Sequence, residues 1–384
     1  MAMGKTGFDQ YYDEAVEPGM RERAYAWATA IGLQDVDGLK PSKYLVATAK
    51  RNIEGEISQE EARRLIDEYY ETKDGHDLAK DAEEADKVSA RIVAVINSPT
   101  FVFSPAYLIG LHGKIFEGIF PHAGKIREVE LTKREEVLNG ESVEYAPSFM
   151  VMQTLEYDFD KEAKFGYKGI SEGGFVAHFS EFIAKIWQAH PFREGNTRTT
   201  AVFAIKYLRT KGFDVTNDLF ARKSWYFRNA LVRANYENTR LNVEKTTAYL
   251  EDFFKVLLLG EEIELKNRFL RIGFEYGSKN AEKVSDLHRQ NGKLDIQGGK
   301  LDVGGRKLDI DGFSAPTRVN IKKLVTAYGG EAFFRRKDVL RVLKLSPTAA
   351  SDLLAKMLER QMIEPVKGHG KGAYRFEHSI IEHA

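Results

Sequence analysis

Residues 190–203 read HPFREGNTRTTAVF and place a histidine, a carboxylate, a glycine, an amide and an arginine within nine residues. Pro191 disfavours helical geometry at His190, so a helix that precedes this stretch ends near that histidine. The small and apolar residues that follow predict a second helix, beginning near Thr197 or Arg198. A tight loop between two helices is therefore expected, with the positive end of the second helix directed at the loop.

Such a loop is suited to phosphate, because backbone N–H groups and a helix N-terminus favour an anion. Gly195 permits close approach of a ligand, and Arg198 can neutralise phosphate oxygens. Glu194 is a hard oxygen ligand for Mg²⁺, Asn196 can hydrogen-bond a phosphoryl oxygen, and His190 can accept a proton from a hydroxyl. Taken singly, the histidine and the Glu-Gly-Asn turn are ordinary structural features. Together they predict phosphoryl or nucleotidyl transfer from a Mg-nucleotide to an alcohol.

The surrounding sequence predicts a mainly helical fold. Residues 175–189 place large apolar side chains on one broad face, and residues 201–208 are apolar nearly all round, as in a helix at the centre of a bundle. Residues 41–72 read as two short helices, in which Gly55 ends the first and Ser58 with Glu61 opens the second. One β signal interrupts the helices: Asn139-Gly140 is flanked by short β-prone runs and predicts a hairpin, with an exposed loop as the alternative.

Composition excludes several classes of protein. The 384 residues predict two or three domains, and equal numbers of basic and acidic residues, 57 each, give no overall basic field for nucleic acid. The absence of cysteine excludes disulfides, thiolate zinc sites and a cysteine nucleophile. No signal peptide is evident and no run approaches the ~20 apolar residues of a membrane span, so we expect a cytoplasmic protein that does not bind a membrane.

The C-terminal part has a different character. Residues 292–312 repeat a seven-residue unit, GKLDIQG, GKLDVGG and RKLDIDG, which predicts a short β-ladder or an ordered linker. Residues 317–384 read as helices followed by a Gly-rich segment between two apolar patches, a pattern typical of a winged helix with residues 346–361 as its recognition helix. Six basic residues could touch a DNA backbone or could be solvated surface: Lys337, Arg341, Lys344, Lys367, Lys371 and Arg375.

HPFREGNTR closely resembles the motif of Fic-domain proteins, His-x-Phe-x-Asp/Glu-Gly-Asn-x-Arg. Residues 115–129, IFEGIFPHAGKIREV, resemble the early helix and the AG-x-x-R segment of that family. The predicted hairpin falls where Fic domains have a target-binding flap. The resemblance covers roughly residues 100–260. It implies a protein adenylyltransferase that moves AMP from ATP to a hydroxyl of a target protein.

Carried over residue by residue, the resemblance makes His190 the general base, Phe192 the anchor of the loop in the core, and Glu194 the Mg²⁺ ligand. Asn196 would hold the α-phosphate and Arg198 the more distal phosphates, so His190, Asn196 and Arg198 are the expected catalytic residues. The expected nucleotide-binding residues are Arg193, Glu194, Gly195, Asn196, Thr197 and Arg198. The flap, with Val137, Leu138, Val143 and Tyr145, would hold a target segment by strand-like pairing.

Two departures from the family pattern bear on the donor. The family has glycine at the position of Thr197 and often a second arginine, which binds the γ-phosphate, at the position of Ala201. Without that arginine, either the triphosphate is held differently or the donor is not ATP. The phosphate-transferring branch carries asparagine and lysine where this chain has Glu194 and Thr197, so Glu194 favours nucleotidyl transfer.

Residues 47–58, ATAKRNIEGEIS, resemble the inhibitory helix of antitoxins that silence Fic toxins, with Glu54 and Gly55 matching its Glu-Gly. Lys50 stands where that helix has serine or threonine, and the usual partner of the glutamate is replaced by Ala201. Glu54 could pair with Arg198 instead. The alternative is a plain capped helical pair.

We therefore expect an N-terminal helical, inhibitory segment (1–88), a Fic-type catalytic domain with a β-hairpin flap (89–265), a connecting helix and Gly-rich linker (266–316) and a winged-helix-like domain (317–384). The expected function is Mg²⁺-dependent, ATP-dependent adenylylation of a target protein or of the chain itself. The alternative is a nucleotide-sensing regulator whose winged helix binds DNA. The oligomeric state stays open, with a homodimer as one option.

Overall fold

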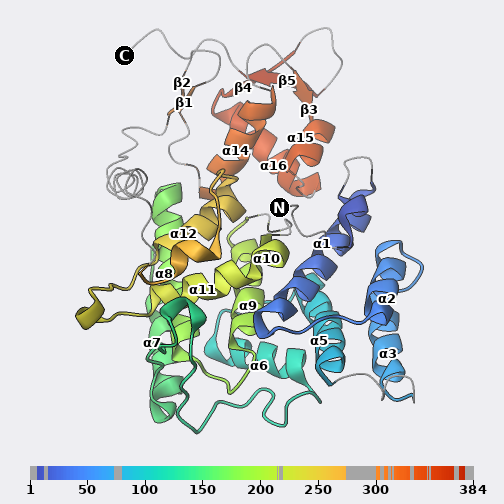
Figure 1. The fold of residues 1–384 in the computed structure, drawn as a ribbon. Coiled ribbons are helices and arrows are strands. Elements are labelled where there is room, and N and C mark those ends of the chain that lie inside the picture. Colours follow the sequence, from blue (N-terminus) through green and yellow to red (C-terminus); the bar gives the residue numbers. More distant parts are fainter. Residues whose placement is uncertain are drawn as a thin grey trace. The chain divides into compact units, whose positions relative to one another are not determined.

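The computed structural model describes residues 7–12, 16–72, 80–213, 215, 219–273, 300–302, 307–309, 313, 315–328, 333–343, 345, 347–366 and 372–376. The chain divides into two compact units. Unit 1 contains residues 1–165, 176–210 and 215–276, and unit 2 contains residues 166–175, 211–214 and 277–384. The described residues are mainly helical (Figure 1), which confirms the predicted fold class.

Unit 1 is built almost entirely of helices. Its described α-helices, of which α8 begins in unit 2, are α1 (Pro18–Gly32), α2 (Lys43–Ile53), α3 (Gln59–Tyr69), α5 (Lys80–Asn97), α6 (Pro105–Phe116), α7 (Val151–Ala163), α8 (Glu172–Ala189), α9 (Asn196–Thr210), α10 (Leu219–Arg222), α11 (Ser224–Ala234) and α12 (Ala248–Phe254). Short 3-10 and π turns connect them: η1 (Asp9–Tyr11), η2 (Leu33–Asp37), η3 (Glu136–Leu138), η4 (Ser148–Met150), η5 (Thr239–Leu241), η6 (Lys255–Leu259) and η7 (Asn267–Leu270).

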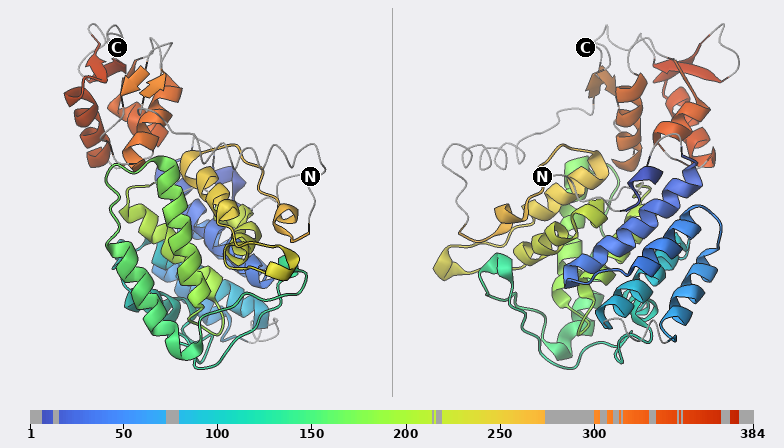
Figure 2. Two further views of the ribbon diagram at one scale, coloured as in Figure 1. Left: turned by 90° about the vertical axis from the view of Figure 1, so that its left-hand side faces the viewer. Right: turned by 45° about the vertical axis from the view of Figure 1, so that its right-hand side comes forward.

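The two helices predicted in residues 41–72 are α2 and α3, and their ends follow the capping residues. The Ser42 hydroxyl accepts from the Leu45 N–H at 3.0 Å and the Ser58 hydroxyl accepts from the Glu61 N–H at 3.1 Å, so each helix has a side-chain N-cap. Gly55 follows α2 with φ +81°, the left-handed conformation that glycine adopts most easily. Figure 2 shows α1, α2, α3 and α5, in shades of blue, packed side by side.

Helix α9 forms the centre of unit 1. Every residue from Asn196 to Leu208 is buried, in agreement with a helix predicted to be apolar all round, and α5 and α6 lie against it (Figure 1). Aromatic side chains from α7, α8 and the loop before α6 fill the space around Phe203 and Tyr207 and include Phe101, Phe103, Phe159 and Phe182. This packing fixes the direction in which the N-terminus of α9 presents the motif loop.

The predicted hairpin is correct at its turn and wrong in its strands. Asn139 and Gly140 have φ of +53° and +93°, so the chain reverses where the Asn-Gly pair predicts a turn. Residues 130–147, all of which the structure describes, contain the 3-10 turn η3 and no strand. Backbone pairing is confined to the turn, where the Glu141 N–H donates to the Leu138 carbonyl at 3.1 Å, and no ladder continues from it. The segment is held from outside instead, because the Ile272 N–H donates to the Val137 carbonyl at 3.0 Å.

The described part of unit 2 combines three helices with a small sheet. Its elements are α14 (Ala315–Tyr328), β3 (Phe334–Arg335), α15 (Arg336–Leu343), α16 (Pro347–Glu359), β4 (Ile363–Pro365) and β5 (Ala373–Phe376), and the antiparallel sheet has the order β3-β5-β4. A core that includes Ile321, Phe334, Val339, Met357 and Phe376 holds them together. Helices followed by a terminal strand pair agree with the pattern read from residues 317–384, whereas the winged-helix class itself remains a prediction.

Two copies of the seven-residue repeat pair with each other. Strands β1 (Lys300–Asp302) and β2 (Lys307–Asp309) are antiparallel, with Leu301 opposite Leu308, as expected of a short β-ladder. The first copy, residues 292–298, and the basic residues Lys344, Lys367 and Lys371 lie outside the described residues. None of the helices in the described part of the chain combines the length and the apolar character that crossing a bilayer needs.

Candidate functional site

The motif loop occupies residues 190–195, between the last residue of α8 and the first of α9. Helix α8 ends one residue before His190, as Pro191 predicts, and α9 begins at Asn196, one residue earlier than expected. His190 has φ +47° and its N–H donates to the Trp187 carbonyl at 3.0 Å, so the chain turns sharply there. The sequence thus predicted the position of the loop correctly.

The His190 side chain lies in the interior and is 2% exposed. Its ring stacks on Tyr145 with centroids 3.9 Å apart and meets the edge of Trp187 at 5.3 Å. Both ring nitrogens are buried without a hydrogen-bond partner among the described residues. Burial, and then the positive charge of Lys133, hold the pKa of His190 well below its usual value, so the imidazole is neutral at neutral pH.

Arg127 holds the backbone of this turn. Its buried guanidinium donates to the His190 carbonyl at 2.7 Å, to the Val129 carbonyl at 2.8 Å and to the Ala146 carbonyl. One side chain therefore joins the end of α8 to the two segments that flank the flap. Arg127 belongs to the AG-x-x-R segment that the sequence singles out, but sequence reasoning assigned it no role.

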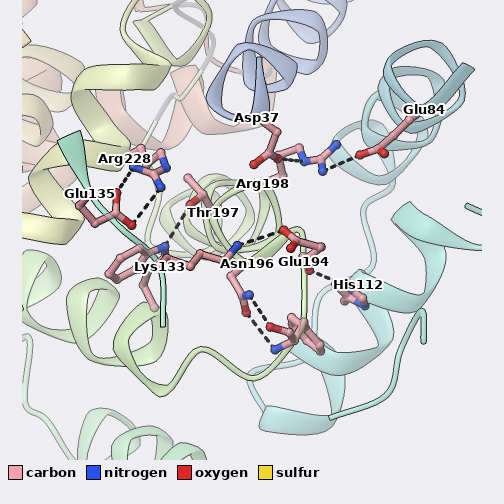
Figure 3. A network of polar contacts seen from close by, with 12 residues as sticks. Asp37, Glu84, His112, Lys133, Glu135, Glu194, Asn196, Thr197, Arg198 and Arg228 are labelled. Carbon is pink, nitrogen blue, oxygen red and sulfur yellow. Dashed lines mark hydrogen bonds and ion pairs between the residues drawn. The ribbon is translucent and has the colours of Figure 1, made fainter. Parts of the chain in front are cut away.

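Asn196 closes the loop on itself (Figure 3). The Phe192 N–H donates to Asn196 Oδ1 at 3.0 Å, and Asn196 Nδ2 donates back to the Phe192 carbonyl at 2.7 Å. Phe192 is buried, as its predicted role as an anchor requires. The amide of Asn196 is thus engaged within the loop, and its expected role at the α-phosphate stays a prediction.

His112, on α6, is a site residue that sequence reasoning missed. Its Nδ1 accepts from the Gly124 N–H at 2.9 Å, and its Nε2 lies 3.1 Å from the Glu194 carbonyl (Figure 3). The ring also stacks on Phe192 with centroids 3.8 Å apart. Burial lowers the pKa of His112 to about 4, and the accepting Nδ1 places the proton on Nε2, which donates to Glu194.

The lowered pKa of His112 predicts that the folded protein loses stability in acid. The folded pKa of about 4 lies below the unfolded value near 6.5, so the stabilisation is complete above pH 6.5. It disappears as the pH falls toward 4, because only the unfolded chain gains the proton over that interval, and the loss from this group is roughly 3 kcal/mol. Urea denaturation at pH 7.5, 6, 5 and 4.5 measures it. His112→Phe should flatten the slope; an unchanged slope in that variant would contradict the assignment.

Gly195 is required by both its backbone and its surroundings. It has φ +77°, and a Cβ there would lie 2.5 Å from the ring of Phe116, which is fully buried. We expect Gly195→Ala to lower the free energy of unfolding by about 2–4 kcal/mol, the sum of left-handed strain and a clash in the core. The matched control is Gly118→Ala, where φ is +69° and a Cβ would meet nothing within 4 Å. Equal urea midpoints for the two variants would refute the role of Phe116.

Glu194 and Arg193 are the exposed side chains of the loop. Glu194 is 51% exposed, and its Oε2 lies 3.0 Å from Nζ of Lys133, which comes from the segment that precedes the flap turn. Thr197, in contrast, is buried, and its hydroxyl accepts from Nε1 of Trp187 at 3.0 Å. The expected nucleotide-binding set is therefore divided: Arg193 and Glu194 face outward, whereas the side chain of Thr197 faces the core.

Arg198 is the largest departure from the expected site. It is 1% exposed, and its Nη1 donates to Gln34 Oε1 at 2.9 Å while its Nη2 donates to Glu84 Oε1 at 2.8 Å (Figure 3). Its Nε lies 2.8 Å from Asp37 Oδ2, an ion pair without the directionality of a hydrogen bond. Its guanidinium also lies over the Phe116 ring at 4.7 Å. In this structure Arg198 joins α9 to η2 and α5, and its expected role at the distal phosphates stays a prediction.

The segment expected to be inhibitory makes different contacts. Glu54 is exposed and accepts a hydrogen bond from the Tyr11 hydroxyl, and Gly55 ends α2. The acidic partners of Arg198 are Asp37 and Glu84, so the expected pairing of Glu54 with Arg198 is not what the structure has. Inhibition by Glu54 stays a prediction without a structural counterpart in the described part of the chain.

The flap side chains face the interior. Val137, Leu138, Val143 and Tyr145 are all less than 10% exposed. A buried ion pair holds the segment in place, because both carboxylate oxygens of Glu135 accept from the Arg228 guanidinium, at 2.5 and 3.0 Å. In this arrangement the four predicted side chains pack against the domain instead of presenting themselves to a target.

Comparison with known proteins supplies a family for this part of the chain. Residues 102–208 match the model of the Fic/DOC family, so the segment that carries the motif loop is a Fic/DOC domain. The match spans the flap, α8, the motif loop and most of α9. None of the curated proteins compared with the chain matches it.

Three solved structures of Bartonella proteins are similar to parts of the chain. The N-terminal FIC domain of Bep8 from Bartonella sp. 1-1C has 18% identity and a TM-score of 0.37, covering 50% of this chain and 92% of that one. The N-terminal Fic domain of a Bep from Bartonella sp. AR 15-3 has 20% identity and a TM-score of 0.36, covering 47% and 84%. BepC from Bartonella tribocorum, with bound AMPPNP, has 20% identity and a TM-score of 0.35, covering 49% and 89%.

Proposed function

We propose that the chain is a nucleotidyltransferase that moves AMP from Mg-ATP to a hydroxyl of a protein. The observation that carries this proposal is His190: a neutral imidazole, with neither nitrogen hydrogen-bonded among the described residues, lies in the same six-residue loop as the exposed carboxylate of Glu194, inside a Fic/DOC domain. A base and a metal ligand at the N-terminus of a buried helix are the parts that such a transfer needs.

In the proposed reaction the target hydroxyl attacks the α-phosphorus of ATP. The bond from that phosphorus to the oxygen bridging to the β-phosphate breaks, pyrophosphate leaves, and His190 accepts the hydroxyl proton. Both His190 nitrogens are closed to solvent, so a neighbouring side chain must move before a hydroxyl reaches them. Tyr145 stacks on the ring and belongs to the flap, so the entry of a target segment and the opening of the base are coupled in this proposal.

Glu194 fits the metal that the family implies. In the described part of the chain no group of three or more histidine, aspartate or glutamate residues could hold a metal by itself. One exposed carboxylate that shares Mg²⁺ with phosphate oxygens is a usual arrangement, and Glu194 is such a carboxylate. When bound, the ion would neutralise charge on the phosphates.

The test is to determine which labelled phosphate of ATP becomes attached to protein. The purified protein is incubated with Mg²⁺, a cell lysate and ATP labelled at the α- or the γ-phosphate. Adenylyl transfer predicts that the α-label enters protein and the γ-label does not, with release of pyrophosphate. Incorporation of the γ-label would show phosphoryl transfer instead, and incorporation of neither label into any protein, including the chain itself, would contradict the proposal.

The charge of unit 2 does not favour the alternative of a DNA-binding regulator. The described helix α16, the expected recognition helix, carries Asp352 and Glu359 beside Lys356. Two of the expected basic contacts are engaged, since Arg341 pairs with Asp338 and Arg375 with Glu364. We therefore assign the proposed function to unit 1 alone.

A further inference from the structure

The positions expected to bind the distal phosphates offer no free cation. All three guanidinium nitrogens of Arg198 have partners within 2.9 Å, from Gln34, Asp37 and Glu84. Ala201, one turn later on α9, is buried and apolar. A triphosphate carries its charge mainly on the β- and γ-phosphates, so a site that accepts one needs an accessible cation beside the metal ligand.

Two cations lie beside Glu194: Arg193, the exposed residue that precedes it in the loop, and Lys133, which pairs with its carboxylate. Lys133 Nζ lies 3.0 Å from Glu194 Oε2 (Figure 3), and its side chain is 29% exposed. Its segment is held at two points: the Lys133 N–H donates to the Ser142 hydroxyl at 3.3 Å, and Glu135, two residues later, makes the buried pair with Arg228. The lysine is therefore presented by an anchored backbone.

We propose that Lys133 binds the terminal phosphates of the donor nucleotide, the task for which the motif arginines were expected. The inference rests on the proposed function, because it names the phosphate ligand of that same site. In the free protein the ammonium pairs with Glu194. When Mg-nucleotide binds, Glu194 turns to the metal and Lys133 turns to a phosphate, so each charge exchanges one partner for another and none is left buried and unpaired.

A second observation places the ammonium near the reacting centre. After burial, the charge of Lys133 is the largest cause that lowers the pKa of His190. The ion pair with Glu194 places the ammonium beside the expected metal ligand, where we expect the phosphates of the donor to lie. The flexible stem of lysine allows its ammonium to follow them.

Binding of ATP and AMP tests the inference, with dissociation constants measured by calorimetry in the presence of Mg²⁺. Lys133→Gln should weaken ATP binding about tenfold to a hundredfold, the usual consequence of losing a charge-assisted contact, and change AMP binding by less than about threefold. Lys133→Arg should keep most of the ATP affinity. The matched control is Lys164→Gln, which removes an exposed lysine paired with Asp160 on α7, and should bind both nucleotides as the wild type does.

The outcomes separate this inference from the proposed function. If the wild-type protein binds ATP and Lys133→Gln prefers ATP over AMP as strongly as the wild type, the inference is wrong and the proposed function stands. If Asp37→Asn, which loosens the partners of Arg198, raises ATP affinity tenfold while Lys133→Gln has no effect, Arg198 is the phosphate ligand and the inference is overturned. If the wild-type protein binds neither nucleotide, both proposals fall.

Discussion

His190→Ala is expected to lower the rate of transfer to protein by roughly a hundredfold to ten-thousandfold, the usual cost of losing a general base. The imidazole contributes no side-chain hydrogen bond to the described structure, so its removal leaves no polar group without a partner. It does remove a stacking partner of Tyr145 and leaves alanine at φ +47°. Because asparagine tolerates the left-handed region, His190→Asn is the companion variant that keeps the backbone and removes the base.

The rate is measured as α-label entering protein, beside circular dichroism and ATP affinity for each variant. We expect both His190 variants to fold and to bind ATP within a fewfold of the wild type, since the loss belongs to the chemical step. Lys185→Ala, which removes a lysine paired with Glu181 on α8, the helix that ends just before His190, is the control and should transfer at the wild-type rate. Transfer by either His190 variant near the wild-type rate would contradict the mechanism.

Local signals explain what the sequence predicted well. The end of α8, the loop and the start of α9 follow from Pro191, Gly195 and the apolar run beyond, because each acts on the backbone within a few residues. The ends of α2 and α3 follow from Ser42, Ser58 and Gly55 in the same way. These features do not depend on which distant segment packs against them, and the structure agrees with each to within two residues.

The directions of the side chains depend on partners that are distant in the sequence, and the sequence did not predict them. Arg198 is directed by Gln34 and Glu84, which lie 164 and 114 residues away, and the loop is held by His112, 82 residues away. None of these three partners has a spacing or motif in the sequence that marks it. A buried histidine on an apolar helix looks the same in sequence whether it fills space or, as His112 does, hydrogen-bonds the backbone of a loop.

The flap shows a third kind of limit. Asn139-Gly140 predicted the reversal of the chain correctly, because the positive φ of both residues is a local requirement. Whether strands extend from that turn depends on the partner of the flanking backbone. The Ile272 N–H donates to the Val137 carbonyl and Asn139 Nδ2 donates to the Ile272 carbonyl, so the turn is held by a segment 133 residues after Asn139 and not by a second strand of its own.

Replacing Arg198 is the second change with a large expected effect, and the effect should fall on stability. Its guanidinium neutralises Asp37 and Glu84 and satisfies the buried amide of Gln34. We expect Arg198→Met to lower the free energy of unfolding by about 2–4 kcal/mol, because the two carboxylates lose their partner in a poorly solvated place. The effect should lie toward the lower end of that interval, since Asp37 and Glu84 are 34% and 21% exposed and water screens them in part.

The partners of Arg198 give this prediction its control. If the arginine acts by neutralising them, Asp37→Asn with Glu84→Gln should recover part of the stability lost in Arg198→Met, so the triple variant should be more stable than the single one. Urea denaturation of the four proteins completes the cycle, and ATP affinity is measured on each. A folded Arg198→Met protein with wild-type stability and a hundredfold weaker affinity for ATP would show that the arginine serves the nucleotide. We expect the reverse, because a guanidinium that is 1% exposed and bound by three side chains must break those contacts before a phosphate can reach it.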